Sequence, residues 1–347
     1  MTFSNKLIYW YLENKRSLPW RKTKNPYFIW LSEIMLQQTR VAQGLSYYEA
    51  FTKEYPTVFD LARAKESEVL KLWQGLGYYS RARNLHATAK IVANEFDGLF
   101  PNSYIELKKL KGIGDYTASA IASICYNKPD AVVDGNVYRV LARYFGIDTP
   151  INSSAGIKQF KELAQELIDI SQPGTFNQAI MDFGALHCKP QNPLCDRCPF
   201  SSSCVALEKQ QQKELPVKLK KAKITKRYFN YLVCVTSDQR IAVQQREGKG
   251  IWKGLYEFPL IESTKAINEE ELLTNEEFLF EKENVSLFNE KQLVHKLSHQ
   301  HLYTKFWIVS LGKLNNKSIK MSELPNLPVP VLIANFLKSF PSTKRYF

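Results

Sequence analysis

The chain has 347 residues, of which 44% are hydrophobic and 23% charged. This length allows two domains with separate cores, and the composition is that of a globular rather than a disordered protein. No apolar run approaches the ~20 residues that a membrane span needs, and the N-terminus lacks the pattern of a signal peptide. We therefore expect an intracellular protein that does not enter a membrane. The formal net charge of +13 favours a polyanionic partner.

The first part of the chain, residues 1–207, is predicted to be helical. Apolar residues recur at helical spacing in several segments, and Gly and Pro residues separate these segments from one another. The predicted helical segments include 27–38, 80–96, 115–126 and 136–145. This pattern predicts a mainly α domain.

The composition changes after residue 207. Residues 208–226 are polar and basic, which is typical of a linker. Three following segments, 228–238, 240–247 and 302–311, are rich in Val, Ile, Tyr and Phe and are predicted to be strands. The acidic stretch 267–278 between them has a more helical character. Residues 227–347 are therefore predicted to form a second, smaller α/β domain.

Four of the six cysteines fall within 17 residues, with the spacing C-x6-C-x2-C-x5-C. They are Cys188, Cys195, Cys198 and Cys204. A short loop with four thiolates can enclose one metal centre, and disulfides are rare inside cells. Zinc sites usually combine two C-x2-C pairs, and only one such pair is present here. Cys125 and Cys234 lie in apolar surroundings and are predicted to be small buried residues.

Residues 107–122 place Gly112 and Gly114 between two helical segments. Glycines permit a tight turn whose backbone N–H groups point outward at the start of the second helix, and such a turn binds phosphate without reading sequence. A plain turn between helices is the alternative.

Two carboxylates are candidates for catalysis. Glu33 is the only acid in an apolar helical segment, so it lies either on a solvated face or in a cleft where its pKa is raised. Asp134, followed by Gly135, either belongs to a hairpin turn or caps the helix that follows. As a cap it would feel the positive end of the helix, which favours the ionised form. Two carboxylates in unlike environments suit glycosidic bond cleavage.

Four stretches together resemble adenine DNA glycosylases of the MutY type, within the helix-hairpin-helix, endonuclease III-like superfamily of base-excision glycosylases. They are SEIMLQQTRV from Ser32, GIGDYTA from Gly112, VVDGN from Val132 and the cysteine loop. The resemblance spans nearly the whole chain. It implies a helical glycosylase domain (1–207) with one [4Fe–4S] cluster in the loop 188–204, a linker (208–226) and a Nudix-like lesion-recognition domain (227–347).

The resemblance also assigns catalytic roles. Glu33 matches the general acid that protonates adenine at N7, and Asp134 matches the aspartate that supports cleavage of the bond. Asn136 matches a residue that helps to organise this site. Tyr116 stands where the related lyases carry a lysine that forms a Schiff base for strand cleavage. We therefore expect a monofunctional glycosylase that hydrolyses adenine mispaired with 8-oxoguanine or guanine in double-stranded DNA.

Further positions are expected to contact DNA, because an enzyme that extrudes a base must fill the gap. In relatives, the positions matching Gln38 and Tyr78 wedge into the duplex. Ser298 and His299 match a Phe-Ser-His loop that recognises oxidised guanine, although Leu297 replaces its aromatic residue. The remaining candidates are Arg21, Gln37, Thr39, Leu76 and the hairpin glycines 112 and 114. Core aromatic and ordinary hairpin residues are the alternatives for Tyr78 and for the loop.

Other functions remain open from the sequence. A glycosylase of another specificity, such as thymine in a G·T mismatch, and a bifunctional lyase are the nearest enzymatic alternatives. A catalytically silent DNA-damage sensor would use the hairpin and cluster only for binding. A Nudix hydrolase is disfavoured, since no metal-binding acidic helix follows Trp252 in the expected pattern. The resemblance implies a monomer in the bacterial cytoplasm, associated with the nucleoid through DNA.

Overall fold

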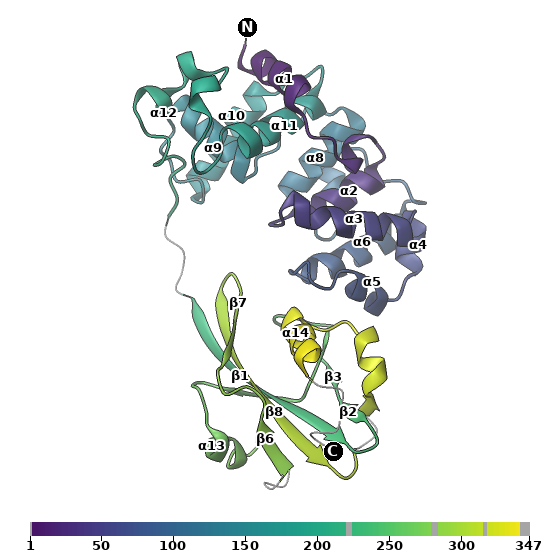
Figure 1. Cartoon of the computed structure of the whole chain (residues 1–347). Coiled ribbons are helices and arrows are strands. Elements are labelled where there is room, and N and C mark those ends of the chain that lie inside the picture. The colour runs from purple at the N-terminus through teal and green to yellow at the C-terminus, as the bar shows by residue number, and fades with distance from the viewer. Residues whose placement is uncertain (1, 220–223, 279–283, 315–317, 341–347) are drawn as a thin grey trace. The chain divides into compact units, whose positions relative to one another are not determined.

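The computed structural model describes residues 2–219, 224–278, 284–314 and 318–340. Its residues form two compact units, drawn from Met1–Arg63 with Asn84–Lys220 and from Ala64–Arg83 with Lys221–Phe347. Figure 1 shows the helices of the first unit in purple to teal and the strands of the second in green to yellow. Each unit is described separately below.

The first unit is built of helices, as the periodicity predicts. Its helices are α1 (Phe3–Asn14), α2 (Pro26–Leu36), α3 (Val41–Glu54), α4 (Val58–Arg63), most of α6 (Ser80–Glu95), α7 (Tyr104–Leu107), α8 (Asp115–Tyr126), α9 (Gly135–Phe145), α10 (Ser154–Leu167), α11 (Pro173–Asp182) and α12 (Val205–Glu208). Short 3-10 turns cover Pro19–Arg21, Cys195–Arg197 and Ser201–Ser203, and a π-helical turn over Phe183–His187 follows α11. The four predicted helical segments correspond to α2, α6, α8 and α9.

Helix α2 is buried nearly all round, and this position follows from its composition. Ile29, Trp30, Leu31 and Met35 are each at most 1% exposed. A helix that is apolar on every face belongs in the interior, where its burial contributes about 1.5–3 kcal/mol per large side chain. Pro26 starts the helix, where its missing N–H is not needed. The one acid of this helix is therefore carried into the core.

The second unit contains a mixed sheet in the order β6-β8-β1-β2-β9, with β5 paired to β1 and β7 paired to β8. Its strands are β1 (Thr225–Thr236), β2 (Arg240–Ala242), β5 (Leu260–Ser263), β6 (Val285–Leu287), β7 (Leu293–Lys296), β8 (Gln300–Leu311) and β9 (Ser318–Lys320), and β3 (Gln244–Gln245) and β4 (Tyr256–Glu257) form a separate pair. Its helices are α5 (Glu66–Leu72), α13 (Glu269–Leu273) and α14 (Val331–Ser339), with a 3-10 helix over Met321–Asn326. The predicted strands and the acidic helix are thus present.

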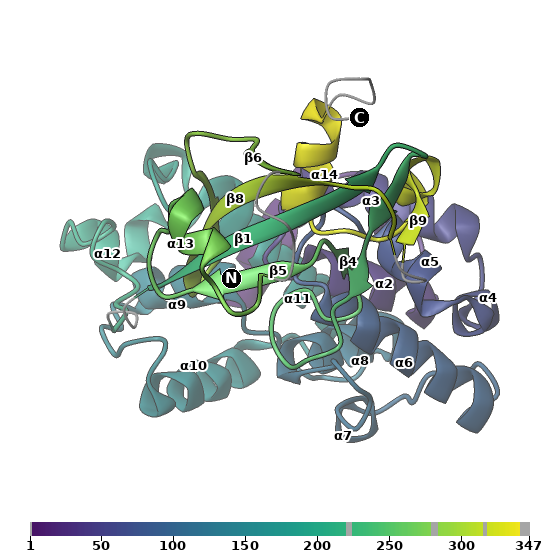
Figure 2. The ribbon, with the colours of Figure 1, turned by 90° about the horizontal axis from the view of Figure 1, so that it is seen from below.

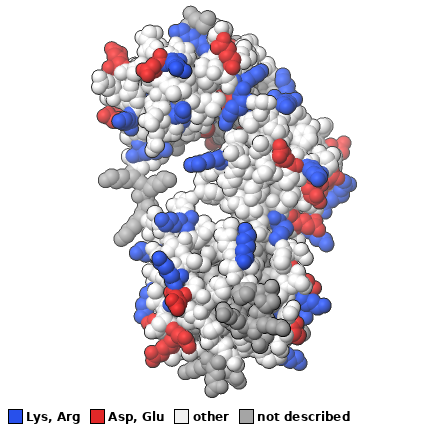
Figure 3. Space-filling view, in the orientation of Figure 1, with Lys and Arg blue, Asp and Glu red and all other residues white. Residues whose placement is uncertain are grey.

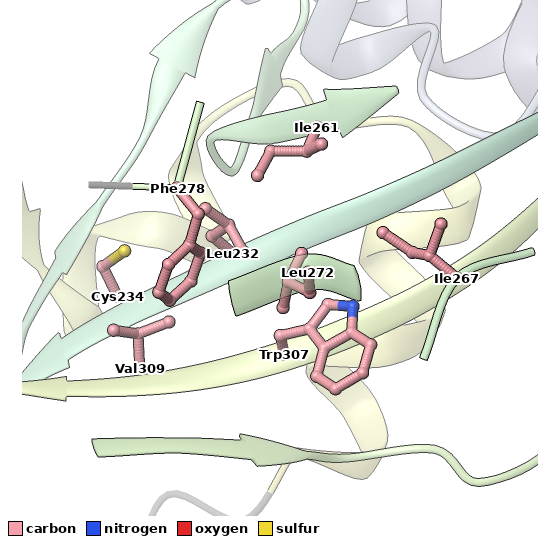
Figure 4. Close-up of a cluster of buried hydrophobic side chains, with 8 residues drawn as sticks. All are labelled: Leu232, Cys234, Ile261, Ile267, Leu272, Phe278, Trp307 and Val309. Carbon is pink, nitrogen blue, oxygen red and sulfur yellow. The ribbon is translucent and has the colours of Figure 1, made fainter. Parts of the chain in front are cut away.

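Strands β1 and β8 form the centre of this sheet. They run parallel and in register, from Thr225 opposite Gln300 to Thr236 opposite Leu311, and Figure 2 shows them side by side. One face packs against α13, and its cluster of Leu232, Cys234, Ile261, Ile267, Leu272, Phe278, Trp307 and Val309 is drawn in Figure 4. The other face packs against α14, where the rings of Phe306 and Phe336 stack with centroids 4.1 Å apart.

Helix α5 and the loop that follows it, from the N-terminal half of the sequence, contact the C-terminal domain within the second unit. The Nζ of Lys71 donates to the carbonyl oxygens of Pro325 and Leu327, and the backbone N–H of Val329 donates to the side chain of Gln74. The guanidinium of Arg83 donates to the carbonyl of Lys253 at 2.6 Å. These bonds fix residues 64–83 on this unit.

Candidate active site

A cavity of about 900 Å3 lies in the helical unit. It is bounded by α2, by the first turns of α8 and α9, and by α11. The cavity brings together nine of the residues singled out in the sequence: Arg21, Glu33, Gln37, Gln38, Thr39, Gly114, Tyr116, Asp134 and Asn136. These residues come from positions up to 115 apart in the chain, so the fold assembles them.

Glu33 lies inside this cavity and not on a solvated face. The residue is 8% exposed, and burial raises the pKa of its carboxyl. A hydrogen bond with Tyr116 and the charge of Arg21 lower this pKa, whereas the negative charge of Asp134 raises it further. Because burial is the largest of these effects, the pKa of Glu33 is higher than that of an ordinary glutamate. A carboxyl with a raised pKa can remain protonated and act as a general acid.

Asp134 caps helix α9 and does not form a hairpin turn. Its Oδ1 accepts the backbone N–H groups of Asn136 and Val137, each at 2.8 Å, and its Oδ2 accepts the side-chain amide of Asn136 at 2.8 Å. Burial raises the pKa of Asp134, while these hydrogen bonds and the charge of Arg139 lower it. The carboxylate of Asp134 thus accepts three hydrogen bonds that have no counterpart at Glu33. The two carboxyl groups therefore lie in different environments.

Tyr116 of α8 contacts residues of two other helices that line the cavity, Glu33 of α2 and Met181 of α11. Its hydroxyl donates to the sulfur of Met181 at 3.1 Å and is also a hydrogen-bond neighbour of Glu33. Burial and the nearby carboxylates raise the pKa of Tyr116 well above its usual value. The phenol is therefore a neutral hydrogen-bonding group, and it cannot act as the amine nucleophile that a lyase uses.

Arg139 is a residue of this site that the sequence analysis missed. Its Nη2 donates to the Oδ1 of Asn136 at 2.9 Å and to the carbonyl of Gly184 at 2.6 Å, while its Nε donates to the carbonyl of Cys188 at 2.7 Å. A guanidinium has five donors in a fixed plane, which lets one side chain join several acceptors. Arg139 therefore links the side-chain amide of Asn136 to the first cysteine of the loop.

A buried ion-pair network on the other side of the cavity was also missed. The carboxylate of Asp182, which is fully buried, accepts from Arg16 and, at 3.0 Å, from Arg21. Arg21 additionally donates to the hydroxyl of Tyr11 and, at 3.1 Å, to the side chain of Gln178. Arg21 thus occupies the cavity wall in a fixed orientation. No local sequence signal marks this network, because Gln178 and Asp182 lie more than 150 positions from the arginines that they contact.

Replacing Asp182 by Asn is expected to lower the free energy of unfolding by about 3 kcal/mol, because it leaves two partly buried guanidinium groups without their anion. Urea denaturation measures this change. The matched control is Asp60→Asn, which removes an exposed pair with Arg63 and should change stability by about 0.5 kcal/mol or less. Equal effects of the two substitutions would refute a structural role for the buried network.

The glycine hairpin has the geometry that its sequence predicts. Gly112 has a φ of +81°, and a Cβ there would lie 2.7 Å from the Cβ of Asn84. Gly114 is the N-cap of α8, and no atom lies within 4 Å of the place where its Cβ would be. A glycine at 112 is thus required by both conformation and space, whereas Gly114 leaves the start of α8 open to a ligand.

The residues after α2 lie at the rim of the cavity. Gln37 ends the helix and donates to the hydroxyl of Thr117 at 3.2 Å. Gln38 has a φ of +56°, a left-handed conformation that is uncommon for a residue with a side chain. Thr39 donates weakly to the carbonyl of Gln37 at 3.4 Å. This tight turn holds the Gln38 backbone in one conformation.

The other predicted DNA-contact residues lie in the second unit. Tyr78 is 45% exposed with a φ of +48°, and its hydroxyl lies 2.6 Å from that of Ser298. Leu76, by contrast, is buried at 5% exposure. His299 is exposed, and its carbonyl accepts the backbone N–H of Thr225 at 3.1 Å. The structure therefore brings Tyr78 and Ser298 together, although 220 positions separate them.

All four loop cysteines line one small cavity of about 30 Å3. Burial raises the pKa of Cys198 to about 11, and the neighbouring thiolates raise it too. Arg143 donates to the sulfur of Cys188 at 3.4 Å and to the carbonyl of Lys189 at 2.7 Å. Four converging sulfurs that repel one another as thiolates fit a cationic group between them. Among the described residues, however, no cluster of His, Cys, Asp or Glu has the arrangement of a single-ion metal site.

Comparisons with known proteins agree with this arrangement. Residues 31–169 match the HhH-GPD superfamily of base excision DNA repair proteins, and residues 230–339 match the NUDIX domain family. A solved structure of a thermostable thymine-DNA glycosylase is 32% identical, with a TM-score of 0.56 over 60% of this chain and 95% of that chain. A complex of endonuclease III with DNA, at 22% identity and a TM-score of 0.53, shares the fold. In the described residues, no helix is long and apolar enough to cross a membrane.

Relatives that match all or part of the chain are adenine DNA glycosylases. The adenine DNA glycosylase of Buchnera aphidicola from Baizongia pistaciae is 36% identical over 95% of both chains. The human adenine DNA glycosylase is 45% identical over 61% of this chain and 41% of that protein. The match to the Buchnera enzyme runs through both units, including the helices that enclose the cavity. The chain therefore belongs to the adenine DNA glycosylases, enzymes of base excision DNA repair.

Proposed function

We propose that this enzyme is a monofunctional glycosylase that hydrolyses the N-glycosidic bond of adenine mispaired with 8-oxoguanine or guanine in double-stranded DNA. One observation carries this proposal: Glu33 and Asp134 meet in one cavity, and a tyrosine occupies the place of the lyase lysine. A cavity of about 900 Å3 is large enough for an extruded base and its sugar.

In the proposed reaction, Glu33 holds a proton and gives it to N7 of adenine, which makes the base a better leaving group. As the bond breaks, positive charge develops on the sugar, and the carboxylate of Asp134 stabilises it. Asn136 holds this carboxylate in place through its backbone and side-chain N–H groups. Water then attacks the sugar carbon, and the DNA strand stays intact because no lysine is among the described residues that line the cavity, so none there can form a Schiff base.

The test is base release from duplexes that carry one adenine opposite 8-oxoguanine, guanine or thymine, with and without alkali after the reaction. Strand breaks that appear only after alkali, and chiefly opposite 8-oxoguanine, are the expected result. Breaks without alkali would instead indicate a lyase. Tight binding without release of any base would support a damage sensor, and release of thymine from a G·T duplex would support the thymine specificity.

We also propose that Cys188, Cys195, Cys198 and Cys204 hold one [4Fe–4S] cluster. When bound, the cluster orders the loop, and Arg139 and Arg143 connect that loop to helix α9. A structural role is supported by the bonds that both arginines donate to loop carbonyls, Arg139 to that of Cys188 and Arg143 to that of Lys189. The Tyr78 and Ser298 pair, with His299 beside it, is proposed to contact the oxidised guanine, and Gln38 to enter the duplex near it.

Replacing Cys198 by Ser is expected to remove the iron, the sulfide and the broad visible absorbance of the cluster, and to lower the melting temperature. Iron analysis, absorbance and a thermal melt measure these changes. The control is Cys125→Ser, which lies outside the loop and should keep the full iron content. Iron-free wild-type protein with unchanged stability would refute the cluster, and zinc in its place would support the alternative metal.

A further inference from the structure

One face of the C-terminal sheet is apolar and buried at one end of its central strands, and aromatic and basic at the other end. At one end, Leu232 pairs with Trp307 and Cys234 pairs with Val309, within the core that packs against α13. Toward the start of both strands, alternate residues on the same face are Tyr228 opposite Tyr303 and Lys226 opposite His301. The tyrosines and the histidine are half-buried and Lys226 is exposed. The core thus ends before the strands do.

The uncovered end is aromatic and basic. The rings of Tyr228 and Tyr303 stack with centroids 5.2 Å apart and planes inclined by 24°. The Nζ of Lys226 lies 5.9 Å from the centroid of the Tyr303 ring. Strand β7 extends the same face, with Val294 opposite Tyr303 and Lys296 opposite His301. We call this set, Lys226, Tyr228, Val294, Lys296, His301 and Tyr303, the tyrosine platform.

The charge on this unit is unevenly distributed. Three consecutive glutamates lie in α13, and Figure 3 shows acidic side chains over that helix, at the lower left, and basic ones where β1 begins. In the described part of the chain, neither Lys226 nor Lys296 forms an ion pair with an acid. The nearby pair of Arg227 and Glu262 belongs to the opposite face. The platform therefore presents uncompensated positive charge.

We propose that the tyrosine platform binds unpaired DNA. Exposed aromatic rings with cations beside them are how proteins hold single strands, because each base can stack on a ring while its phosphate meets a lysine. On its other side, Tyr228 has the small residue Ser263 as its strand partner, so a base can continue the stack of two rings there. Duplex DNA keeps its base faces covered and cannot use this arrangement.

The position of the platform gives the site a use beyond the proposed base release. Strand β1 begins beside the turn that joins β7 to β8, where the N–H of Thr225 donates to the carbonyl of His299 at 3.1 Å. Single-stranded DNA bound on the platform would therefore lie next to the loop that carries Ser298 and His299. This favours mispairs that adjoin an unpaired stretch of DNA.

The experiment measures the binding of the full-length wild-type protein and its variants to a dye-labelled oligothymidine by fluorescence anisotropy, over a range of salt concentrations. The double variant Lys226→Gln/Lys296→Gln should bind about tenfold more weakly, and the slope of log affinity against log salt should fall by about 1.4, or 0.7 for each phosphate contact. Tyr303→Thr removes the ring but places a residue that favours strands, and it should also weaken binding about tenfold, with little change in slope.

The control is Lys313→Gln, an exposed lysine beyond the opposite end of β8, which should leave oligothymidine binding unchanged. Adenine release from a blunt duplex should be the same for all variants, so this test is separate from that of the proposed activity. Unchanged oligothymidine binding in both platform variants would overturn the proposal. Equal weakening of binding to a blunt duplex would also overturn it, because the platform would then contact paired DNA.

Discussion

Glu33→Gln should reduce the single-turnover rate of adenine release by about 10³-fold, because the amide keeps the shape of the side chain but has no acidic proton to give. DNA binding should stay within a few-fold of wild type, since the substitution leaves the cavity wall in place. Quenched-flow or manual single-turnover assays with enzyme in excess measure the rate. The exposed Glu49 on α3 supplies the control, and Glu49→Gln should release adenine normally.

The raised pKa of Glu33 also predicts how rate and stability respond to pH. The rate for wild type should fall as pH rises through this pKa, since the carboxyl loses its proton. Burial disfavours the charged form, so the stability contribution of Glu33 is complete below its unfolded pKa and is lost as pH rises through the folded pKa. Glu33→Gln should therefore gain stability over wild type with rising pH. A difference in melting temperature that is constant with pH would contradict this environment.

Asp134→Asn should lower the single-turnover rate by about 10³-fold while leaving the protein folded. Asparagine caps helices as well as aspartate does, so the start of α9 should survive the change. What is lost is the negative charge that faces the sugar cation. The free energy of unfolding, from urea denaturation, should change by about 1 kcal/mol or less, and the adenine assay should report the loss of rate.

Two comparisons make the Asp134 experiment decisive. Asp148→Asn removes an exposed carboxylate just after α9 and should preserve both rate and stability. Asp134→Ala removes cap and charge together, so it should lose about 1 kcal/mol or more of stability in addition to the rate. If Asp134→Asn retained the wild-type rate, the carboxylate would be only a cap, and the cation would need another partner.

Local pattern was sufficient to predict much of the helical unit. The apolar periodicity of α2 predicted its helix, and the Asp-Gly step before a helical run allowed the N-cap that Asp134 forms. For Glu33, the residues alone left a solvated face and a cleft open, and only the resemblance pointed to a catalytic cleft. The structure places it in the cavity because α2 is buried on every side.

Long-range contacts were beyond the reach of sequence patterns. Arg139 follows a helical pattern like any other residue of α9, and its role depends on acceptors at Gly184 and Cys188 that only folding brings near. Likewise, nothing in the sequence indicates that residues 64–83 join the C-terminal unit or that Tyr78 meets Ser298. Such pairings depend on tertiary geometry, which periodicity and propensity do not encode.

The double use of Asp134, as helix cap and as the charge facing the cavity, has a consequence inside a cell. A mutation that changes this residue to Asn would leave an intact protein that still finds mispairs but releases the base about 10³-fold more slowly. Such a copy would occupy the lesion and shield it from functional enzyme. The substitution would then remove nearly all of the activity and would also block repair of the lesion by functional enzyme. The second effect would increase with the amount of variant protein in the cell.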